Sequence, residues 1–269
     1  MVSKEKQVKA FFDHSEKIEE ILNDKELFVF LDYDGTLTPI VDTPDLAILS
    51  DEMRAGIEEL TKLYKVSIVS GRATDDVKAK VNIDGIYYAG SHGFEILQPN
   101  GEVVIHAQAQ EFRYTMDEVY AKLFERLKEI KGALVEHVKY TISLHYRLVS
   151  HEDFSKFKSI IEKTLAEYKN LKITTGKKVF EVRPQIDWHK GKAVEFILKQ
   201  FGFRKNKHIA MYLGDDTTDE DVFTTLKDRV VGVLVAEKSH ATAADFIVHD
   251  TQEVKRVIHY LIERAKRQQ

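Results

Sequence analysis

Short apolar runs of β-forming residues alternate with amphipathic helical segments along most of the chain, and this alternation restricts the possible folds more than any other feature. Residues 27–31 (LFVFL) form a continuous apolar run, which is typical of a strand buried on both faces. Similar runs at 65–69, 208–213 and 230–235 are each followed by a helical pattern. Strands that alternate with helices indicate a parallel sheet covered on both faces, so we expect a doubly wound α/β core.

The middle of the chain follows a different pattern. Residues 110–131 form a long helical pattern that ends at Gly132, and 151–169 form a second one. Each is followed by two β-rich runs, which are 134–138, 141–147, 171–175 and 179–183. This αββαββ order predicts an α+β unit inserted into the Rossmann-like core with its parallel sheet. We expect residues 1–108 and 186–269 to form the core and residues 109–185 to form an inserted cap domain.

Composition excludes several classes of protein. Of the 269 residues, 43% are hydrophobic and 31% are charged, which suits a packed core and not a disordered chain. The absence of cysteine excludes disulfides and thiolate metal sites, and the net charge of −4 argues against a nucleic-acid partner. The longest apolar run, 230–236, is too short to span a membrane, and segment 1–9 lacks the apolar region of a signal peptide. We therefore expect a soluble, cytoplasmic protein without a membrane partner.

Two of the expected strands are followed by carboxylates. Asp32 and Asp34 follow the run 27–31 within the string DYDGT, and Asp215 begins the string DDTTDED after the run 208–213. Ligands of open α/β sheets bind beyond the carboxyl ends of the strands, so both strings are candidates for a binding site. An Asp-Gly turn or an acidic helix start would explain either string alone, but the second is more acidic than a helix cap requires. Hard oxygen ligands of this kind suit Mg²⁺.

Hydrogen-bond donors accompany these carboxylates. The string SGR at 70–72 follows another expected strand, and its hydroxyl, backbone and guanidinium groups can donate to phosphate oxygens. Lys190 lies at an expected helix start, where a cation opposes the helix dipole and indicates an anionic partner. A plain Ser-Gly turn and a solvated lysine are the alternatives, and Lys192 is a second candidate for the cation.

The strings DxDGTL, a serine, a lysine and GDDxTDED, in this order, resemble the four motifs of the haloacid dehalogenase-like phosphatases over nearly the whole chain. The resemblance implies that Asp32 attacks phosphorus and forms an aspartyl-phosphate. It implies that Asp34 protonates the departing oxygen and then takes a proton from water. Ser70 and Lys190 would hold the oxygens of the transferred phosphoryl group.

The resemblance also implies a magnesium site. Mg²⁺ would be held by Asp32, the backbone carbonyl of Asp34, and Asp215. Asp216 and Asp219 would orient this site or cap the helix that follows it.

Longer strings refine the resemblance. LDYDGTLTPIVDTPD at 31–45, GSHG at 90–93 and GKKVFEVRP at 176–184 are similar to trehalose-6-phosphate phosphatases, plant forms especially. The position and element order of the insert resemble type IIB caps, which implies a lid that sets specificity. Charged side chains can bind the hydroxyls of a disaccharide through strong hydrogen bonds. The implied substrate-binding residues are Gly71, Arg72, His92, Gly93, Glu136, Lys139, Arg147, Lys177, Lys178 and Glu181.

Other interpretations of the insert remain open. Glu136 and Lys139 flank a hairpin and could form a solvated cross-strand pair, and His145 could be a core histidine. Val138 stands where some family members carry the lysine, and His189 stands where many carry aspartate.

The function that we expect is Mg²⁺-dependent hydrolysis of trehalose 6-phosphate to trehalose and phosphate. The alternatives are a phosphatase for another sugar phosphate, such as sucrose 6-phosphate, and a catalytically silent domain associated with a synthase. The intact Asp32, Asp34, Lys190 and Asp215 argue against the silent domain. We expect a monomer whose one candidate protein partner is a trehalose-6-phosphate synthase.

Overall fold

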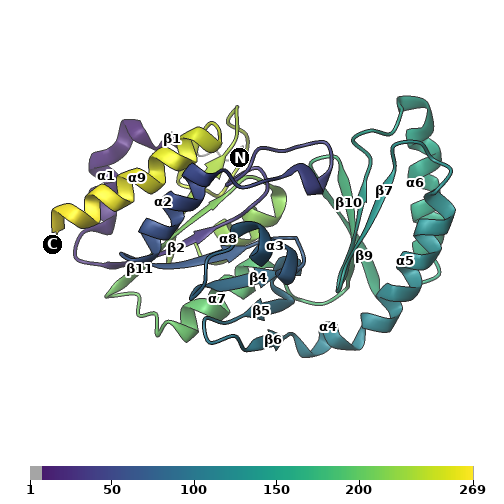
Figure 1. The fold of residues 1–269 in the computed structure, drawn as a ribbon, viewed down its shortest axis with the longest axis horizontal. Coiled ribbons are helices and arrows are strands. Elements are labelled where there is room, and N and C mark those ends of the chain that lie inside the picture. The colour runs from purple at the N-terminus through teal and green to yellow at the C-terminus, as the bar shows by residue number, and fades with distance from the viewer. Residues whose placement is uncertain (1–7, 269) are drawn as a thin grey trace, which may run out of the picture. The chain divides into compact units, whose positions relative to one another are not determined.

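The computed structural model describes residues 8–268, so most of the segment 1–9 considered above lies outside the described residues. The chain divides into two compact units (Figure 1). The first unit contains the described residues up to Val103 and those from His189 onward. The second unit is Val104–Trp188.

A nine-stranded sheet forms the centre of the first unit. All neighbours from β1 to β4 are parallel, and β5 pairs antiparallel with β4 at one side. In spatial order the strands are β1 (Lys9–Ala10), β13 (Phe246–Val248), β12 (Val230–Val235), β11 (His208–Gly214), β2 (Glu26–Leu31), β3 (Lys65–Val69), β4 (Tyr87–Gly90), β5 (Glu95–Leu97) and β6 (Val103–Ile105). The doubly wound α/β class expected from the sequence is confirmed.

The strand order of this sheet reverses between β2 and β11. From β2 the chain continues outward through β3 and β4, whereas from β11 it continues in the opposite direction through β12 and β13. Crossover connections therefore leave in opposite directions at this point, and a crevice forms beyond the strand ends in sheets of this kind. The site described below lies at these two strand ends.

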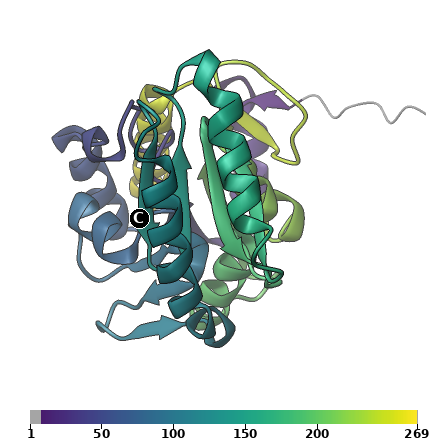
Figure 2. The same ribbon diagram turned by 90° about the vertical axis from the view of Figure 1, so that its right-hand side faces the viewer.

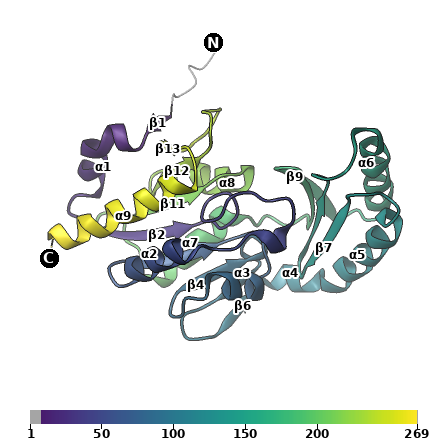
Figure 3. The ribbon, with the colours of Figure 1, turned by 45° about the horizontal axis from the view of Figure 1, so that its top comes forward.

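Helices cover both faces of the sheet. The helices of the first unit are α1 (Ser15–Leu22), α2 (Asp51–Thr61), α3 (Thr74–Val81), α7 (Lys190–Gln200), α8 (Thr217–Thr225) and α9 (Thr251–Gln268). Helices α2 and α9 lie side by side, as Figure 3 shows, and α7 packs against α8. Ser50 caps α2, since its hydroxyl accepts a hydrogen bond from the Met53 N–H at 3.2 Å. Among residues 8–268, no helix combines the length and apolar character that a membrane crossing requires.

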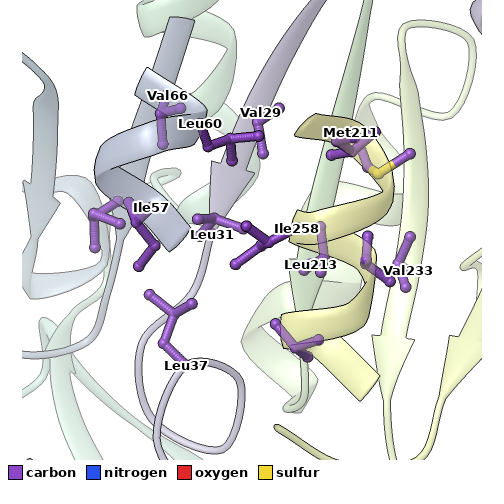
Figure 4. Close-up of a cluster of buried hydrophobic side chains, with 14 of the residues drawn as sticks. Val29, Leu31, Leu37, Ile57, Leu60, Val66, Met211, Leu213, Val233 and Ile258 are labelled. Carbon is purple, nitrogen blue, oxygen red and sulfur yellow. The ribbon is translucent and has the colours of Figure 1, made fainter. Parts of the chain in front are cut away.

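Alternation along β2 explains why the sheet needs a helical layer on each side. Val29 and Leu31 belong to a core cluster that also contains residues of α2 and α9. The intervening Phe28 packs on Phe201, which follows α7, with ring centroids 5.1 Å apart. Both faces of the strand are thus buried. Figure 4 shows the first cluster, in which Val29, Leu31, Leu37, Ile57, Leu60, Val66, Met211, Leu213, Val233 and Ile258 are labelled.

The second unit is a four-stranded antiparallel sheet with helices on one face. The strand order is β7 (Leu134–Val138), β8 (Thr141–His145), β10 (Val179–Pro184) and β9 (Leu171–Gly176). Ile142, Leu144 and Val182 pack into a core with α5 (Arg113–Leu127) and α6 (His151–Leu165), the two helices that stand in front in Figure 2. Because side chains alternate along a strand, the opposite face carries polar residues.

The bounds predicted for one helix of this unit were wrong. The periodicity predicted a single helix over 110–131, but the structure has α4 (Ala107–Glu111) followed by α5. The Phe112 N–H donates to the Ala109 carbonyl, three residues back, at 3.1 Å. This tighter turn ends α4, and α5 begins at the next residue.

Glu19 joins α1 to α9 through a partly buried ion pair. Its carboxylate accepts hydrogen bonds from the Tyr260 hydroxyl at 2.6 Å and the Arg264 Nε at 2.8 Å. Arg264 also donates to the Leu22 carbonyl at the end of α1. Burial by itself would raise the pKa of Glu19, but the hydrogen bonds from Tyr260 and Arg264 outweigh burial and lower the pKa from its usual 4.5.

Glu19→Gln is expected to lower the free energy of unfolding at neutral pH by about 1 kcal/mol or less, because the 40% exposed side chain is screened by solvent. A carboxyl whose pKa is lowered on folding stabilises the fold above its unfolded pKa, and this contribution disappears as the pH falls through the folded value. Urea unfolding at neutral pH and below pH 4.5 should therefore show the difference shrinking in acid. Glu20→Gln, on the exposed side of the same helix, is the control. An effect that does not change with pH would contradict the ion-pair explanation.

Candidate active site

Asp32 is presented at the end of a fully buried strand. Its N–H donates to the Leu213 carbonyl of β11 at 3.0 Å, so the sheet ladder continues to this residue. Only 4% of Asp32 is exposed. Gly35, three residues on, has φ +80°, and a Cβ there would lie 1.9 Å from Asp215 Oδ2. The glycine of the DGT string is therefore required for the two acidic strings to approach each other.

Lys190 bridges two buried carboxylates. It lies in the first turn of α7, is 3% exposed, and its Nζ donates to Asp32 Oδ1 and to Asp219 Oδ1, each at 2.8 Å. Burial alone would lower the pKa of Lys190, but the charges of Asp219 and Asp32 outweigh burial and raise the pKa well above its usual value. The lysine is therefore a fixed positive charge beside Asp32.

Asp219 organises the loop that carries Asp215. Its Oδ2 accepts from the N–H groups of Asp215 at 2.9 Å and Asp216 at 3.0 Å. Its Oδ1 accepts from Lys190 and from the Tyr212 hydroxyl, the latter at 2.6 Å. Both oxygens of this fully buried carboxylate thus accept from donors of the protein. Asp219 and Asp216 also form a capping box at the start of α8, as one of the two roles expected of them requires.

Three carboxylates converge at this point. Oxygens of Asp32, Asp215 and Asp219 all lie within 4.8 Å of one another. Burial raises the pKa of the Asp32 carboxyl well above its usual value; Lys190 opposes this effect, and the charges of Asp219 and Asp215 add to it. The Lys190 ammonium group contacts two of these three carboxylates, Asp32 and Asp219, so a cation would offset the charge that remains in the cluster. Hard oxygen donors in an acidic, buried cluster fit Mg²⁺, and Asp219 is the member least suited to bind it because both its oxygens are already engaged.

The loop after β3 lies against the loop after β4. The N–H of His92 donates to the Ser70 carbonyl at 2.9 Å, and the N–H of Ser91 donates to the Arg72 carbonyl at 2.7 Å. Ser70 is buried, and its hydroxyl accepts from the Arg72 N–H at 3.1 Å. The structure therefore brings together Ser70–Arg72 and His92–Gly93, five of the residues that the sequence singled out.

Arg72 contacts Asp34 directly. Its Nε and Nη2 atoms lie 2.7 Å from Asp34 Oδ2 and Oδ1, respectively, so the pair is bidentate. The guanidinium also donates to Asp76 Oδ2 and to the Pro44 carbonyl, each at 2.8 Å. Hydrogen bonds and charge from Asp34 and Asp76 raise the pKa of Arg72 against the opposing effect of burial.

The remaining candidates lie in the second unit, and two of them, Glu136 and Glu181, lie on the sheet face opposite α5 and α6. Glu136 and Glu181 are each in register with Ser143, so both point to this face. Glu136 Oε2 lies 2.5 Å from His145 Nε2, and Glu181 Oε2 accepts from the Thr174 hydroxyl at 3.5 Å. His145 therefore lies on the polar face and not in the core of this unit.

The other candidates of this unit lie at strand ends. Lys139 and Lys178 occupy the two hairpin turns, with φ of +54° and +68°. Arg147 donates to the Lys177 carbonyl at 2.9 Å and so joins the end of β8 to the β9–β10 turn. The two turns lie at opposite ends of the sheet, because the Lys139 turn follows the pair Val138–Thr141 and the Lys178 turn precedes the pair Val179–His145. The Lys178 Nζ lies 5.8 Å from the centre of the Tyr146 ring, which packs with the core of this unit, so the structure does not bring Lys139 and Lys178 together.

Two residues of the site were missed. Tyr212 holds Asp219 from inside a strand, and Asp76 holds Arg72 from α3. A tyrosine within a buried apolar run normally needs a partner for its hydroxyl, and that signal was available. Asp76 lies four residues after Arg72, a spacing at which charged residues of a helix can pair, but Arg72 precedes the helix.

Similarity to known proteins identifies the family of the chain. The family model described as trehalose-phosphatase matches residues 30–252. "Trehalose 6-phosphate phosphatase RA3" of Zea mays is 41% identical over 255 residues, which cover 89% of this chain and 71% of that protein. A crystal structure of a "trehalose-6-phosphate phosphatase related protein" has a TM-score of 0.79 at 24% identity and covers 91% of this chain and 100% of its own. The fold also matches a haloacid dehalogenase-like hydrolase from Bacteroides thetaiotaomicron (TM-score 0.59, 15% identity, 88% of this chain and 99% of that one). The chain therefore belongs to the trehalose-phosphatase family of enzymes.

Proposed function

We propose that this protein hydrolyses trehalose 6-phosphate to trehalose and inorganic phosphate through an aspartyl-phosphate on Asp32. One observation carries the proposal: Lys190 bridges Asp32 and Asp219 inside a buried acidic cluster at the point where the strand order reverses. A buried lysine beside a buried carboxylate lets an anionic phosphate approach an anionic nucleophile.

The proposed reaction has two displacement steps at phosphorus. In the first, an Asp32 oxygen attacks phosphorus, the bond from phosphorus to the sugar oxygen breaks, and the Asp34 carboxyl gives its proton to that oxygen. In the second, Asp34 takes a proton from water as the water oxygen attacks phosphorus, and the bond to Asp32 breaks. Phosphate leaves, and Asp32 is again a carboxylate. Lys190 and the Ser70 hydroxyl hold phosphoryl oxygens throughout.

The proposed reaction also uses Mg²⁺. Asp32, the Asp34 carbonyl and Asp215 would hold the ion, which when bound offsets the charge of the phosphoryl group. Asp219 orients the loop that carries Asp215, a role supported by the hydrogen bonds that its carboxylate accepts from the N–H groups of Asp215 and Asp216. Asp216 caps the helix that follows, since its carboxylate accepts from the Thr217 N–H.

Specificity for the sugar is assigned to the insert, residues 109–185, which serves as a cap to the core formed by 1–108 and 186–269. The polar face of its sheet carries charged groups suited to the hydroxyls of a disaccharide. From the core, Gly71, His92 and Gly93 contribute. The proposed sugar-binding residues of the insert are Glu136, Lys139, Arg147, Lys177, Lys178 and Glu181. A monomeric state, a cytoplasmic location and a synthase partner stay predictions from the sequence.

A panel of sugar phosphates tests the substrate. Phosphate release is measured with Mg²⁺ from trehalose 6-phosphate, sucrose 6-phosphate and glucose 6-phosphate. We expect kcat/KM for trehalose 6-phosphate to exceed the others by at least about 10³-fold, because a site built to bind hydroxyls rejects substrates that leave its polar groups unpaired.

The same panel separates the parts of the proposal. EDTA should stop turnover, and added Mg²⁺ should restore it. Turnover that EDTA does not change would show that the reaction needs no metal ion. Similar rates on all three esters would support the phosphatase mechanism but contradict the assignment of trehalose 6-phosphate as the substrate. No release from any ester would favour the catalytically silent domain.

A further inference from the structure

The guanidinium of Arg72 is occupied almost completely by the protein. Nε and one N–H of Nη2 donate to Asp34, the second N–H of Nη2 donates to the Pro44 carbonyl, and Nη1 donates to Asp76. A guanidinium has five N–H groups, so these contacts leave one. The side chain is 9% exposed, and its guanidinium carbon lies 5.3 Å from the centre of the Tyr33 ring. An arginine held in this way has little capacity to bind a phosphate or a sugar.

Asp34, unlike Arg72, is well exposed to solvent. Its side chain is 43% exposed, although the reaction requires its carboxyl at one defined place. An exposed aspartate on a loop would otherwise populate several rotamers. Two parallel N–H···O bonds from one rigid guanidinium fix both the position and the plane of the carboxylate. Each oxygen retains a second lone pair, which can carry a proton.

The contacts to Asp76 and Pro44 fix the arginine itself. Asp76 lies in the first turn of α3, and Pro44 begins the short 3-10 helix Pro44–Leu46. The Arg72 backbone is also held, since its N–H donates to the Ser70 hydroxyl. Two separate segments and the loop of Arg72 itself therefore hold the arginine in place.

We propose that Arg72 is a positioning residue that fixes the Asp34 carboxyl for its proton transfers, in place of the substrate contact expected from the sequence. The inference rests on the proposed function, in which Asp34 gives a proton to the sugar oxygen and then takes one from water. In this role Arg72 exchanges no proton and touches no reacting atom. A substitution of Arg72 should therefore lower kcat only because it disturbs the position of Asp34.

A double-mutant cycle tests this dependence. Arg72→Met, Asp34→Asn and the double variant are assayed on the sugar phosphate that the wild type hydrolyses fastest. General acid–base catalysis contributes about 10²–10⁴-fold, so Asp34→Asn should lower kcat by that order. Arg72→Met should lower kcat by about tenfold to a hundredfold, with KM changed by less than about threefold. The double variant should be no slower than Asp34→Asn alone, because residues that act as one unit are not additive.

Three further variants guard against effects on folding. Arg72→Lys keeps the charge but cannot form the bidentate pair, so it should recover only part of the lost kcat. Asp76→Asn loosens the guanidinium without touching Asp34 and should give a smaller fall in kcat that also disappears in the Asp34→Asn background. Lys80→Met is the control: Lys80 donates to the carbonyls of Asp45 and Ala47 in the same segment as Pro44, but contacts neither member of the pair. Its kcat should match the wild type.

The possible results test the positioning role of Arg72 separately from the proton-transfer role of Asp34. If Arg72→Met raises KM and leaves kcat unchanged, or if the double variant loses the product of the two single effects, Arg72 acts on the substrate and the inference is wrong. The inference also fails if Arg72→Met has no effect. If Asp34→Asn itself retains full kcat, the proton-transfer role in the proposed function is wrong.

Discussion

Asp32→Asn is expected to abolish phosphate release, with kcat lowered by about a millionfold, the order observed when an enzyme loses its nucleophile. An amide oxygen is a far weaker nucleophile than a carboxylate, and no other described residue of the cluster has the same place at the end of β2. The fold should survive. Burial and, after the opposing effect of Lys190, the charges of Asp219 and Asp215 raise the pKa of Asp32, so a neutral amide is favoured at this place, and Lys190 keeps Asp219 as a partner. Phosphate release and thermal unfolding measure the two effects, and the midpoint of unfolding should be unchanged or higher.

Trapping the intermediate makes this prediction specific. Wild-type enzyme quenched in acid during turnover should carry one phosphoryl group on the peptide that contains Asp32, and the variant should carry none. Asp42→Asn, an exposed aspartate in the loop after the same motif, is the matched control and should behave as the wild type. Retained turnover in Asp32→Asn would place the nucleophile elsewhere.

The elements with long periodic or apolar patterns were predictable from the sequence. The run at 27–31 is apolar at every position because β2 is covered on both faces, and such a run has few other interpretations. By contrast, β1 and β13 have two and three residues and were missed, since neither is long enough to show a period. The division between α4 and α5 was also missed, because one hydrogen bond of Phe112 causes it and the amphipathic pattern continues across it.

Site residues at strand ends were predictable for a similar reason. Parallel strands bring their carboxyl ends to one edge, so Asp32 and Asp215 could be placed together without a structure. The contact of Arg72 with Asp34 could not, because 38 residues separate them and arginine suits a phosphate as well as a carboxylate. A motif indicates which side chains gather, but their pairing depends on the distances between loops. For Arg72, the motif predicted a substrate contact, whereas we propose that it positions Asp34.

Lys190→Met is expected to impair both activity and stability, for separable reasons. Loss of the ammonium removes the charge that holds the phosphoryl oxygens, which should lower kcat by about 10²–10³-fold or more. The substitution also leaves Asp32 and Asp219 buried without their shared cation. Removing one partner of a buried ion pair costs about 3–5 kcal/mol, so unfolding should occur at markedly lower urea concentration. Lys192→Met, two residues along α7, is the control and should change neither quantity greatly.

A second substitution distinguishes the two losses. In the double variant Lys190→Met/Asp219→Asn, one of the stranded carboxylates becomes neutral, so part of the lost stability should return, while the amide oxygen can still accept from the N–H groups of Asp215 and Asp216. Activity should stay low, because no cation has been restored beside Asp32. If kcat recovered together with stability, Lys190 would act only as a structural countercharge, and the phosphoryl contact assigned to it would be wrong. If stability did not recover, the energetic cost would lie in the lost packing of the lysine side chain and not in unpaired charge.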